Sequence, residues 1–249
     1  MKIPLKSAAE LESMRTSCRM AAEVRDRVGE AVQAGVTTGE LDALARRLIE
    51  GMKAKPSFLG YRGYPAAICI SVNDEVIHGI PGRRVVLPGD VVSLDVGVYY
   101  KGFHGDTATT VMVGVTDPDV IRLVETTRRA LDAAIAAAKP GGSLSDVSHA
   151  VESVVKASGC SVVREFVGHG VGRHLHEDPQ VPNYGVPGRG PVLKPGMTLA
   201  IEPMVNLGRA EVSVLDDKWT VVTRDGRPSA HFEHTVAVLG EGVEVLTLA

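Results

Sequence analysis

Two stretches of the chain are close copies of each other, and this duplication constrains the fold more than any other feature of the sequence. The segment 78–95 (HGIPGRRVVLPGDVVSLD) recurs as 184–202 (YGVPGRGPVLKPGMTLAIE) with one inserted residue. Asp95, the carboxylate that ends the first copy, falls on Glu202, which ends the second. A duplicated scaffold can face two such acids across a pseudo-twofold axis, where carboxylates bind divalent cations or transfer protons.

The duplication extends towards the N-terminal side of each copy. The pairs Thr37-x-x-Glu40 and Ser143-x-x-Asp146 both match capping boxes, which open a helix. Similar openings at Ser7-x-x-Glu10 and Thr116-x-x-Asp119 predict an earlier helix in each half. Capping boxes are common individually, but their matched order favours two related halves, roughly 7–114 and 116–240, each with two helices followed by strands.

Composition excludes several classes of protein. The chain has 249 residues and 44% hydrophobic residues, enough for one large core, and we expect a single domain over residues 1–249. No apolar run approaches the ~20 residues needed to span a bilayer, and the polar N-terminus is not expected to be a signal peptide. A net charge of −3 offers no basic surface for nucleic acid. Three widely spaced cysteines indicate reduced thiols and a cytoplasmic protein.

Hydrophobic periodicity predicts an α+β fold. Helical spacing predicts helices at about 7–34, 38–53, 118–139 and 144–158. Strands are expected at about 66–72, 91–99, 107–113, 162–166, 198–205, 211–215, 219–223 and 234–239. Runs of strands that each follow a helix pair favour a curved, mostly antiparallel sheet with helices packed on one face.

Two acids stand out because they lie in apolar strands. Asp95 lies within VVSLDVGVY, where a carboxylate is costly to bury unless it is paired or bound to a metal. If the following turn is centred between Tyr100 and Lys101, Asp106 lies directly opposite Asp95 and shares its face. Two such anions raise each other's pKa, and a divalent cation between them removes that cost.

Three further residues fit the same site: His169 between two glycines, Glu202 in LAIEPMV, and Glu233 in AHFEHTVAV. Four carboxylates balance two divalent ions, which can activate a shared water molecule. Oxygen-rich ligation with one nitrogen suits manganese, iron, cobalt or zinc. Any single acid could instead form a structural ion pair. A zinc site built from His169, His174 and His176 is a weaker alternative, because the segment has no cysteines and no His-x-x-x-His helix pair.

The chain resembles the bacterial type I methionine aminopeptidases, which have the pita-bread fold. The resemblance covers essentially the whole chain and is carried by CISVNDEVIHGIP, SLDVGVYYKGFHGDTATT, GHGVGRHLHEDP, IEPM and SAHFEHT. It implies removal of the initiator methionine from nascent polypeptides whose second residue is small. It also implies two divalent ions, held by Asp95, Asp106, His169, Glu202 and Glu233.

The resemblance also assigns catalytic roles. A metal-bridging water would attack the methionyl carbonyl, with Glu202 as the proton shuttle. His176 would hydrogen-bond the carbonyl oxygen and the developing oxyanion. His78 would contact the substrate near the scissile amide. From the residues alone, either histidine matches an ordinary solvated loop residue better than a catalytic one.

The same resemblance implies a pocket for the methionine side chain. It would be lined by Tyr61, Tyr64, Cys69, Phe166 and Trp219, with Phe58 and Leu175 nearby, while His78 and His176 would bind the substrate beside the scissile bond. A thioether favours such soft aromatic walls, although scattered aromatic residues also suit an ordinary core. Phe58 replaces a smaller residue, often cysteine, and Leu175 replaces an aromatic residue, so the shape of this pocket differs from the family pattern.

The implied partners are nascent polypeptide N-termini, met at the ribosome by a monomeric cytoplasmic enzyme, with no membrane or nucleic acid involved. Two rival functions remain open. A proline-specific peptidase would share the fold but usually carries an extra N-terminal domain. A catalytically inactive peptide-binding relative would have lost metal ligands, whereas all five residues are present.

Overall fold

The order of elements repeats the succession of two helices followed by strands. The computed structural model describes residues 3–248, and within them lie four α-helices: α1 (Ala8–Ala31), α2 (Thr38–Gly51), α3 (Pro118–Ala137) and α4 (Leu144–Ala157). The strands are β1 (Lys55–Pro56), β2 (Cys69–Val72), β3 (Glu75–Ile77), β4 (Val91–Tyr100), β5 (Phe103–Met112), β6 (Ser161–Val162), β7 (Gly168–Gly170), β8 (Glu177–Val181), β9 (Thr198–Ile201), β10 (Met204–Asn206), β11 (Val212–Val214), β12 (Val221–Thr223), β13 (Ser229–His231), β14 (Glu233–Leu239) and β15 (Gly242–Val245). Among the described residues, no helix has the length and apolar character needed to cross a bilayer.

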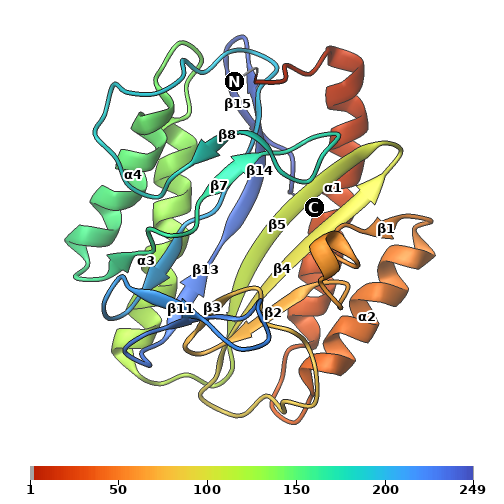
Figure 1. Cartoon of the computed structure of the whole chain (residues 1–249), viewed down its shortest axis with the longest axis vertical. Coiled ribbons are helices and arrows are strands. Elements are labelled where there is room, and N and C mark those ends of the chain that lie inside the picture. Colours follow the sequence, from red (N-terminus) through yellow and green to blue (C-terminus); the bar gives the residue numbers. More distant parts are fainter. Residues whose placement is uncertain (1–2, 249) are drawn as a thin grey trace.

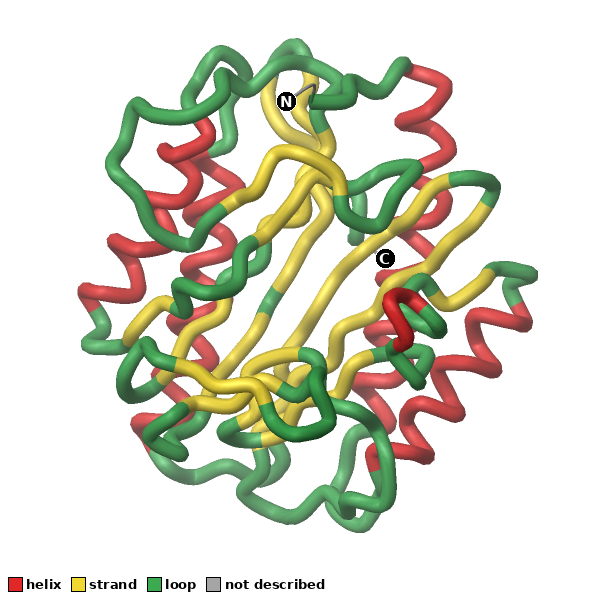
Figure 2. The backbone as a smooth tube through the Cα atoms, in the orientation of Figure 1, coloured by secondary structure: helices red, strands yellow, loops and turns green. Residues whose placement is uncertain are grey.

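The main sheet joins strands from both halves of the chain. Its main path runs in the order β1-β4-β5-β14-β9-β7-β8, while β2 pairs with β4 and β15 pairs with β14, and all these pairs are antiparallel. The central pair is β5 and β14, with β4 and β9 outside it. Figure 1 shows the strands in front of α1 and α3, with α2 and α4 at the two flanks, and Figure 2 shows the sheet curving between the helix pairs. This confirms the predicted α+β class and mostly antiparallel sheet.

Each helix pair covers its own half of the sheet. Buried apolar residues of α1 and α2 pack against β2 and β4, including Leu41, Ile49 and Leu94. The corresponding cluster of the other half joins α3 and α4 to β9 and β14, through residues such as Leu123 and Leu199. Fully burying a Leu or Ile side chain contributes about 1.5–3 kcal/mol, so each half is anchored by a core of its own beneath a shared sheet.

The two copies of the repeated segment make equivalent contacts. Thr37, at the start of α2, forms an isolated antiparallel bridge with Val85, and Ser143, at the start of α4, forms one with Val192. In both halves, the repeated segment thus returns to the N-terminus of the second helix. The duplication read from the sequence corresponds to a duplicated pattern of backbone contacts.

Three of the four expected capping boxes form. Ser7, Thr37 and Ser143 are the N-caps of α1, α2 and α4, and each exchanges contacts with the acid three residues later. The expected box at Thr116 is wrong. Asp117 is the N-cap of α3 and accepts a hydrogen bond from the Asp119 amide at 2.8 Å. Pro118 follows at the first helical position, where its missing N–H costs nothing, so α3 begins where expected but its N-cap lies one residue after Thr116.

The β4–β5 hairpin turns near Lys101-Gly102, as the sequence predicts, but its centre lies one residue later than the centre assumed for the pairing of Asp95 with Asp106. Tyr100 pairs with Phe103, so the two-residue turn is Lys101-Gly102, both with positive φ (46° and 92°), as a tight type I′ turn requires. The expectation that Asp106 lies directly opposite Asp95 is therefore wrong. Because the shift moves Asp106 by two positions relative to Asp95, both still face the same side of the sheet.

Other element boundaries also differ from the expectations. The helices end slightly earlier than expected, and the strand expected over 162–166 is confined to β6. The strand expected over 198–205 divides into β9 and β10 on either side of Glu202-Pro203, because proline cannot donate a ladder hydrogen bond. The short strands β1, β3, β7, β8, β13 and β15 were not expected.

Candidate metal centre and active site

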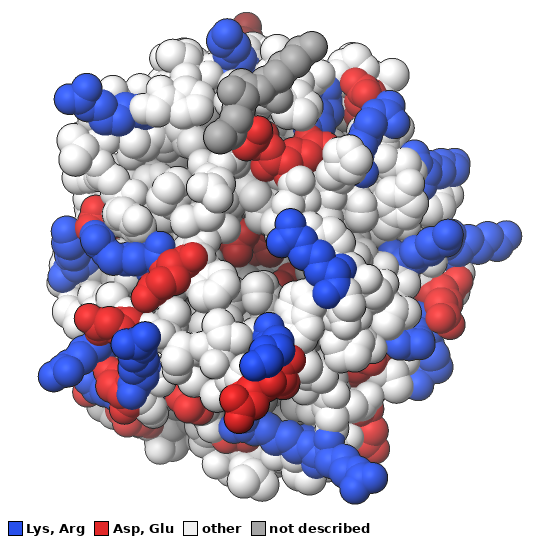
Figure 3. Space-filling model, in the orientation of Figure 1, with Lys and Arg blue, Asp and Glu red and all other residues white. Residues whose placement is uncertain are grey.

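Five residues from five different segments face one cavity of about 350 Å³. Asp95 lies on β4, Asp106 on β5 and His169 on β7, while Glu202 directly follows β9 and Glu233 begins β14. All five line the cavity, as the sequence predicted. Figure 3 shows acidic side chains at the floor of a hollow near the middle of this face, with a basic side chain at its edge.

The ligand atoms of this group are close enough to share a cation. One such atom each from Asp106, His169 and Glu233 lie within 4.8 Å of one another. The Nε2 atom of His169 lies 3.4 Å from Oε1 of Glu202 and 3.9 Å from Oδ2 of Asp106. These separations exceed ordinary hydrogen bonds and suit atoms that converge on a common ion.

The tautomer of His169 follows from its backbone contact. Its Nδ1 lies 2.9 Å from the Gly170 carbonyl oxygen, which can only accept, so Nδ1 carries the proton. Nε2 is then left with its lone pair directed at the acids. A metal-ligating histidine commonly fixes its other nitrogen in this way. Burial, together with the charge of His176, lowers the pKa of His169 to about 3, so the ring is neutral at pH 7.

The glycines beside His169 allow β7 to run close to both neighbours. A Cβ atom at Gly168 would collide with the Ala200 carbonyl oxygen of β9. A Cβ atom at Gly170 would collide with the carbonyl oxygen of Asp178 on β8. Only glycine permits this approach, and it places the His169 ring over the acids.

The four carboxylates are held in an environment that penalises their charge. Burial raises the pKa of Asp95 well above its usual range, and the charge of Asp106 adds to this. Burial and neighbouring acids likewise raise the pKa of Glu202 and Glu233, and burial raises that of Asp106 to about 7.

Several carboxylate oxygens are buried without a partner among the described residues. These atoms are Oδ1 of Asp95, Oδ1 of Asp106 and Oε1 of Glu233. A buried acceptor without a donor is costly, and such orphaned acceptors are rare in native proteins. An oxygen-rich set with one imidazole nitrogen is the donor set that divalent transition metals prefer, so these residues fit a bound cation.

His176 lies at the edge of the same cavity. Its ring stacks on Tyr61 at 5.3 Å between centroids, and its Nδ1 lies 2.9 Å from the Tyr61 hydroxyl. If the hydroxyl donates to Nδ1, Nε2 carries the proton and can donate to a substrate oxygen. Burial, with a further effect from Arg62, lowers the pKa of His176. The ring is therefore a neutral donor at pH 7.

A buried ion pair anchors the loop that carries His176. Lys6, just before α1, pairs with Glu177, and both side chains are 5% exposed. The other carboxylate oxygen of Glu177 accepts the backbone N–H of His174 at 3.1 Å. Breaking a buried pair typically costs about 3–5 kcal/mol, so this contact fixes the loop beside the acids.

His78 lies in the cavity in a strained backbone conformation. Its φ is 60°, in the left-handed region that non-glycine residues rarely adopt. Such strain is often found at functional positions. Its ring meets Phe166 and Trp219 edge to face, at 5.9 and 6.1 Å between centroids. Burial lowers its pKa to about 4, so the ring is neutral at pH 7.

The apolar part of the cavity contains the residues expected for the methionine pocket. Lining it are Phe58, Tyr61, Tyr64, Cys69, Phe166, Leu175 and Trp219. Tyr64 and Trp219 meet edge to face at 5.1 Å. The Phe58 ring lies against Gly97, where a Cβ atom would approach to 2.6 Å. Phe58 therefore occupies the room left by a glycine in the strand that carries Asp95.

The three histidines of the alternative zinc site, His169, His174 and His176, do not converge. The side chain of His174 is exposed and does not line the cavity that contains His169 and His176. Within residues 3–248, the group of side chains that could hold a metal is the one containing Asp106, His169 and Glu233.

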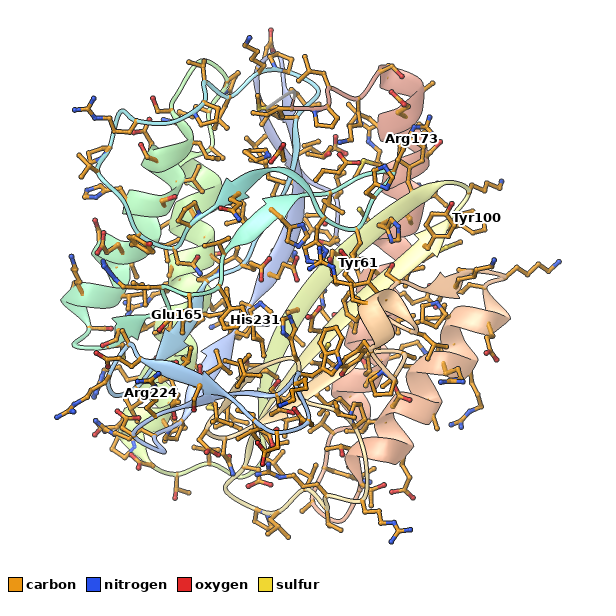
Figure 4. All side chains as sticks on the ribbon, viewed as in Figure 1. Tyr61, Tyr100, Glu165, Arg173, Arg224 and His231 are labelled. Carbon is orange, nitrogen blue, oxygen red and sulfur yellow. The ribbon has the colours of Figure 1, made fainter. Side chains whose placement is uncertain are left out.

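One residue close to the acids was missed from the sequence. His231 is 1% exposed, and its Nε2 lies 3.6 Å from Oε2 of Glu202. The sequence offered one signal for His231. Side chains alternate between the two sides of an extended chain, and His231 is two residues before Glu233, so the two share a face. Arg62 and Glu165, which also line the cavity, were not expected either. Figure 4 labels His231 and Tyr61 near the middle of the molecule and Glu165 towards the side of α3 and α4.

Comparisons with known proteins give consistent matches. The model of metallopeptidase family M24 matches residues 12–239. Methionine aminopeptidase 1 of Bacillus subtilis is 50% identical over 242 residues, which cover 97% of this chain and 98% of that protein. The crystal structure of methionine aminopeptidase from Thermotoga maritima has a TM-score of 0.98 and 46% identity, and covers 100% of both chains. Prolidase from Pyrococcus furiosus has a TM-score of 0.79 at 23% identity, over 98% of this chain and 65% of that one, which is a likeness of fold alone.

Proposed function

Because the chain belongs to metallopeptidase family M24 and, within it, to the methionine aminopeptidases, we propose that its cavity performs this hydrolysis with two divalent metal ions. The fold is the pita-bread fold implied by the resemblance, and the enzyme removes the N-terminal methionine of polypeptides. The proposed ligands are Asp95, Asp106, His169, Glu202 and Glu233.

The observation that carries this proposal is the set of buried acids with unpartnered oxygens beside the free Nε2 of His169. Four carboxylates balance the charge of two divalent ions. When bound, such ions activate a water molecule and polarise the carbonyl of the scissile bond. The donor set suits cobalt, manganese, iron or zinc.

The protein's own residues then move protons and hold the substrate. Glu202 takes the proton of the attacking water and passes it to the leaving amine, because as a proposed ligand it would lie beside that water. His176 donates to the carbonyl oxygen as negative charge develops there. His78, whose ring meets those of Phe166 and Trp219, contacts the scissile amide.

The apolar part of the cavity would hold the methionine side chain. Its walls are soft and aromatic, with Phe58, Tyr64, Cys69 and Leu175 packed together, so it suits an unbranched thioether. We propose that the second residue must be small because the cavity, of about 350 Å³, is shared between this pocket and the metal site.

The setting of the reaction is also a proposal. Ligands come from both halves of the duplication, which supports treating residues 1–249 as one catalytic domain. Cys18, Cys69 and Cys160 are free and buried, which supports a reducing compartment such as the cytoplasm. We propose that the protein acts there as a monomer on nascent polypeptides emerging from the ribosome.

The test uses purified protein reconstituted with manganese and two peptides. Release of methionine from Met-Ala-Ser, with no hydrolysis of Ala-Pro, is the expected result. Hydrolysis of Ala-Pro in preference to Met-Ala-Ser would instead assign a proline-specific peptidase. Binding of Met-Ala-Ser without hydrolysis, at any metal concentration, would assign an inactive peptide-binding protein.

A further inference from the structure

We propose that His231 is a positioning residue that holds the carboxylate of Glu202 through its Nε2–H group. This inference rests on the proposed function, because it concerns the acid to which we give the proton-transfer role. His231 itself does not line the cavity, so it acts through Glu202 and not on the substrate.

The Glu202 carboxylate lies between two imidazole rings. Its Oε1 is 3.4 Å from Nε2 of His169, and its Oε2 is 3.6 Å from Nε2 of His231. The two rings contact different oxygens and come from different strands, β7 and β13. The His169 ring presents the lone pair of Nε2, as its backbone contact requires. The His231 ring is free to present a proton on Nε2 to Oε2 of Glu202.

The backbone of His231 is fixed on both sides. Its N–H donates to Oγ1 of Thr110 at 3.0 Å, and its carbonyl oxygen accepts from the same hydroxyl at 2.7 Å. On the other side, His231 pairs with Met204 of β10, two residues after Glu202. The imidazole is therefore held beside the segment that carries Glu202.

The partner of Nε2 follows from chemistry and burial. Nε2 of His231 is buried and has no hydrogen-bond partner among the described residues. A buried donor left unpaired destabilises a fold, and the nearest charged atom is Oε2 of Glu202. A carboxylate oxygen accepts, so the proton lies on Nε2. The 3.6 Å separation is longer than a hydrogen bond, but such contacts in substrate-free sites commonly tighten when the site is complete.

Three substitutions separate this role from simple packing. His231→Leu removes the donor but fills the space, so the melting temperature of the metal-free protein should stay the same or rise. His231→Gln keeps an N–H donor at nearly the position of Nε2, whereas His231→Asn holds the same amide too far back. His149→Ala, on the exposed side of α4, is the control for losing a histidine elsewhere.

The expected result is a loss in His231→Leu of about 10–100-fold in kcat on Met-Ala-Ser and a similar loss in Mn²⁺ affinity measured by calorimetry. KM should change little, because the residue does not touch the substrate. His231→Gln should recover most of both losses and His231→Asn should not. The proposal is overturned if His231→Leu keeps kcat and Mn²⁺ affinity within twofold, or if His231→Gln is no better than His231→Leu.

A spectroscopic measurement tests the contact even if the proposed function fails. In the metal-free protein, at a pH high enough to ionise Glu202, the histidine side-chain ¹⁵N spectrum should show His231 protonated at Nε2, and Glu202→Ala should shift that resonance. A proton on Nδ1 alone, or a resonance unchanged by Glu202→Ala, would overturn the contact. Failure of the unaltered protein to bind Mn²⁺ or cleave Met-Ala-Ser would count against the proposed function and leave this spectroscopic result to decide on His231.

Discussion

Asp95 and Asp106 lie diagonally across the β4–β5 ladder, since Asp95 pairs with Ala108 and Asp106 pairs with Gly97. Diagonal neighbours on one face of an antiparallel pair are farther apart than directly opposed residues. This spacing leaves room for a cation between the two carboxylates.

The first prediction concerns Asp95 and its counterpart in the second half, Glu202. Asp95→Asn and Glu202→Gln should each lower kcat on Met-Ala-Ser by roughly 10²-fold or more, since even supporting residues of metal sites contribute 10–100-fold. The metal-free fold should be retained, because a neutral amide relieves repulsion among buried acids. Activity assays and circular dichroism check both points. Asp132→Asn, an exposed acid on α3, is the control, and near-normal activity in either variant would remove that acid from the ligand set.

The second prediction separates His176 from the ligands. His176→Ala should lose roughly 10²-fold or more in kcat, as other oxyanion donors do, while binding manganese as tightly as the unaltered protein. Steady-state kinetics and calorimetry measure the two effects. The matched control is His174→Ala, two residues away and exposed, which should stay near normal. Loss of metal in proportion to activity would make His176 a ligand.

The third prediction concerns the pocket formed by Tyr64, Cys69, Phe166 and Trp219. Leu-Ala-Ser should be cleaved more slowly than Met-Ala-Ser, because a misplaced methyl group costs about 1–3 kcal/mol. Lys-Ala-Ser should be essentially inert, because its ammonium group would be buried without a partner. The measurement is kcat/KM over the three peptides. Equal rates would indicate a broad aminopeptidase and a different pocket.

The sequence predicted the scaffold and the acids because both follow local rules. A carboxylate within an apolar strand is conspicuous, and the duplication relates Asp95 to Glu202 without knowledge of the fold. The exact partner of Asp95 was missed because it depends on a single turn, and Lys101-Gly102 moved the register. The strand β7 was missed because glycines on both sides of His169 disfavour an isolated strand, although they are needed between β8 and β9.

The roles of His78 and His176 came from the resemblance and not from physical rules. Nothing local distinguishes a loop histidine that contacts Tyr61 from one in solvent, because the contact joins segments far apart in the chain. His231 was missed although its alternation with Glu233 was visible. Its significance depends on the approach of Glu202, which only the folded chain provides.

The fourth prediction is a pH dependence of the metal-free protein. Burial raises the pKa of Asp106 to about 7 and that of Asp95, Glu202 and Glu233 well above the usual range. An acid whose pKa is higher in the folded state than in the unfolded state stabilises the fold. This stabilisation is complete below the unfolded-state pKa of about 4, and it is lost as the pH rises through the folded-state pKa.

The buried histidines have the opposite effect on stability, because they stabilise the fold as the pH rises, but they do so over a lower pH range. His169 and His231, with pKa values of about 3, add stability only as pH rises to about 6.5, where unfolded histidine loses its proton. Between about pH 7 and 8 the acids therefore dominate, and the free energy of unfolding should fall by up to about 1.4 kcal/mol per pH unit for each proton involved. Urea titrations in a chelator measure this slope. Glu202→Gln should make it shallower, and a flat or rising dependence would contradict the arrangement of buried acids.

The measurement that tests the central claim most directly is metal content against activity in one preparation. The protein is stripped with a chelator, titrated with Mn²⁺, and followed by calorimetry and by hydrolysis of Met-Ala-Ser. The account predicts no turnover without metal, and full recovery of turnover with two bound ions per chain once Mn²⁺ is saturating. Asp106→Asn should lose both the turnover and the binding of two ions. Full turnover by the metal-free protein, or unchanged binding in Asp106→Asn, would contradict it.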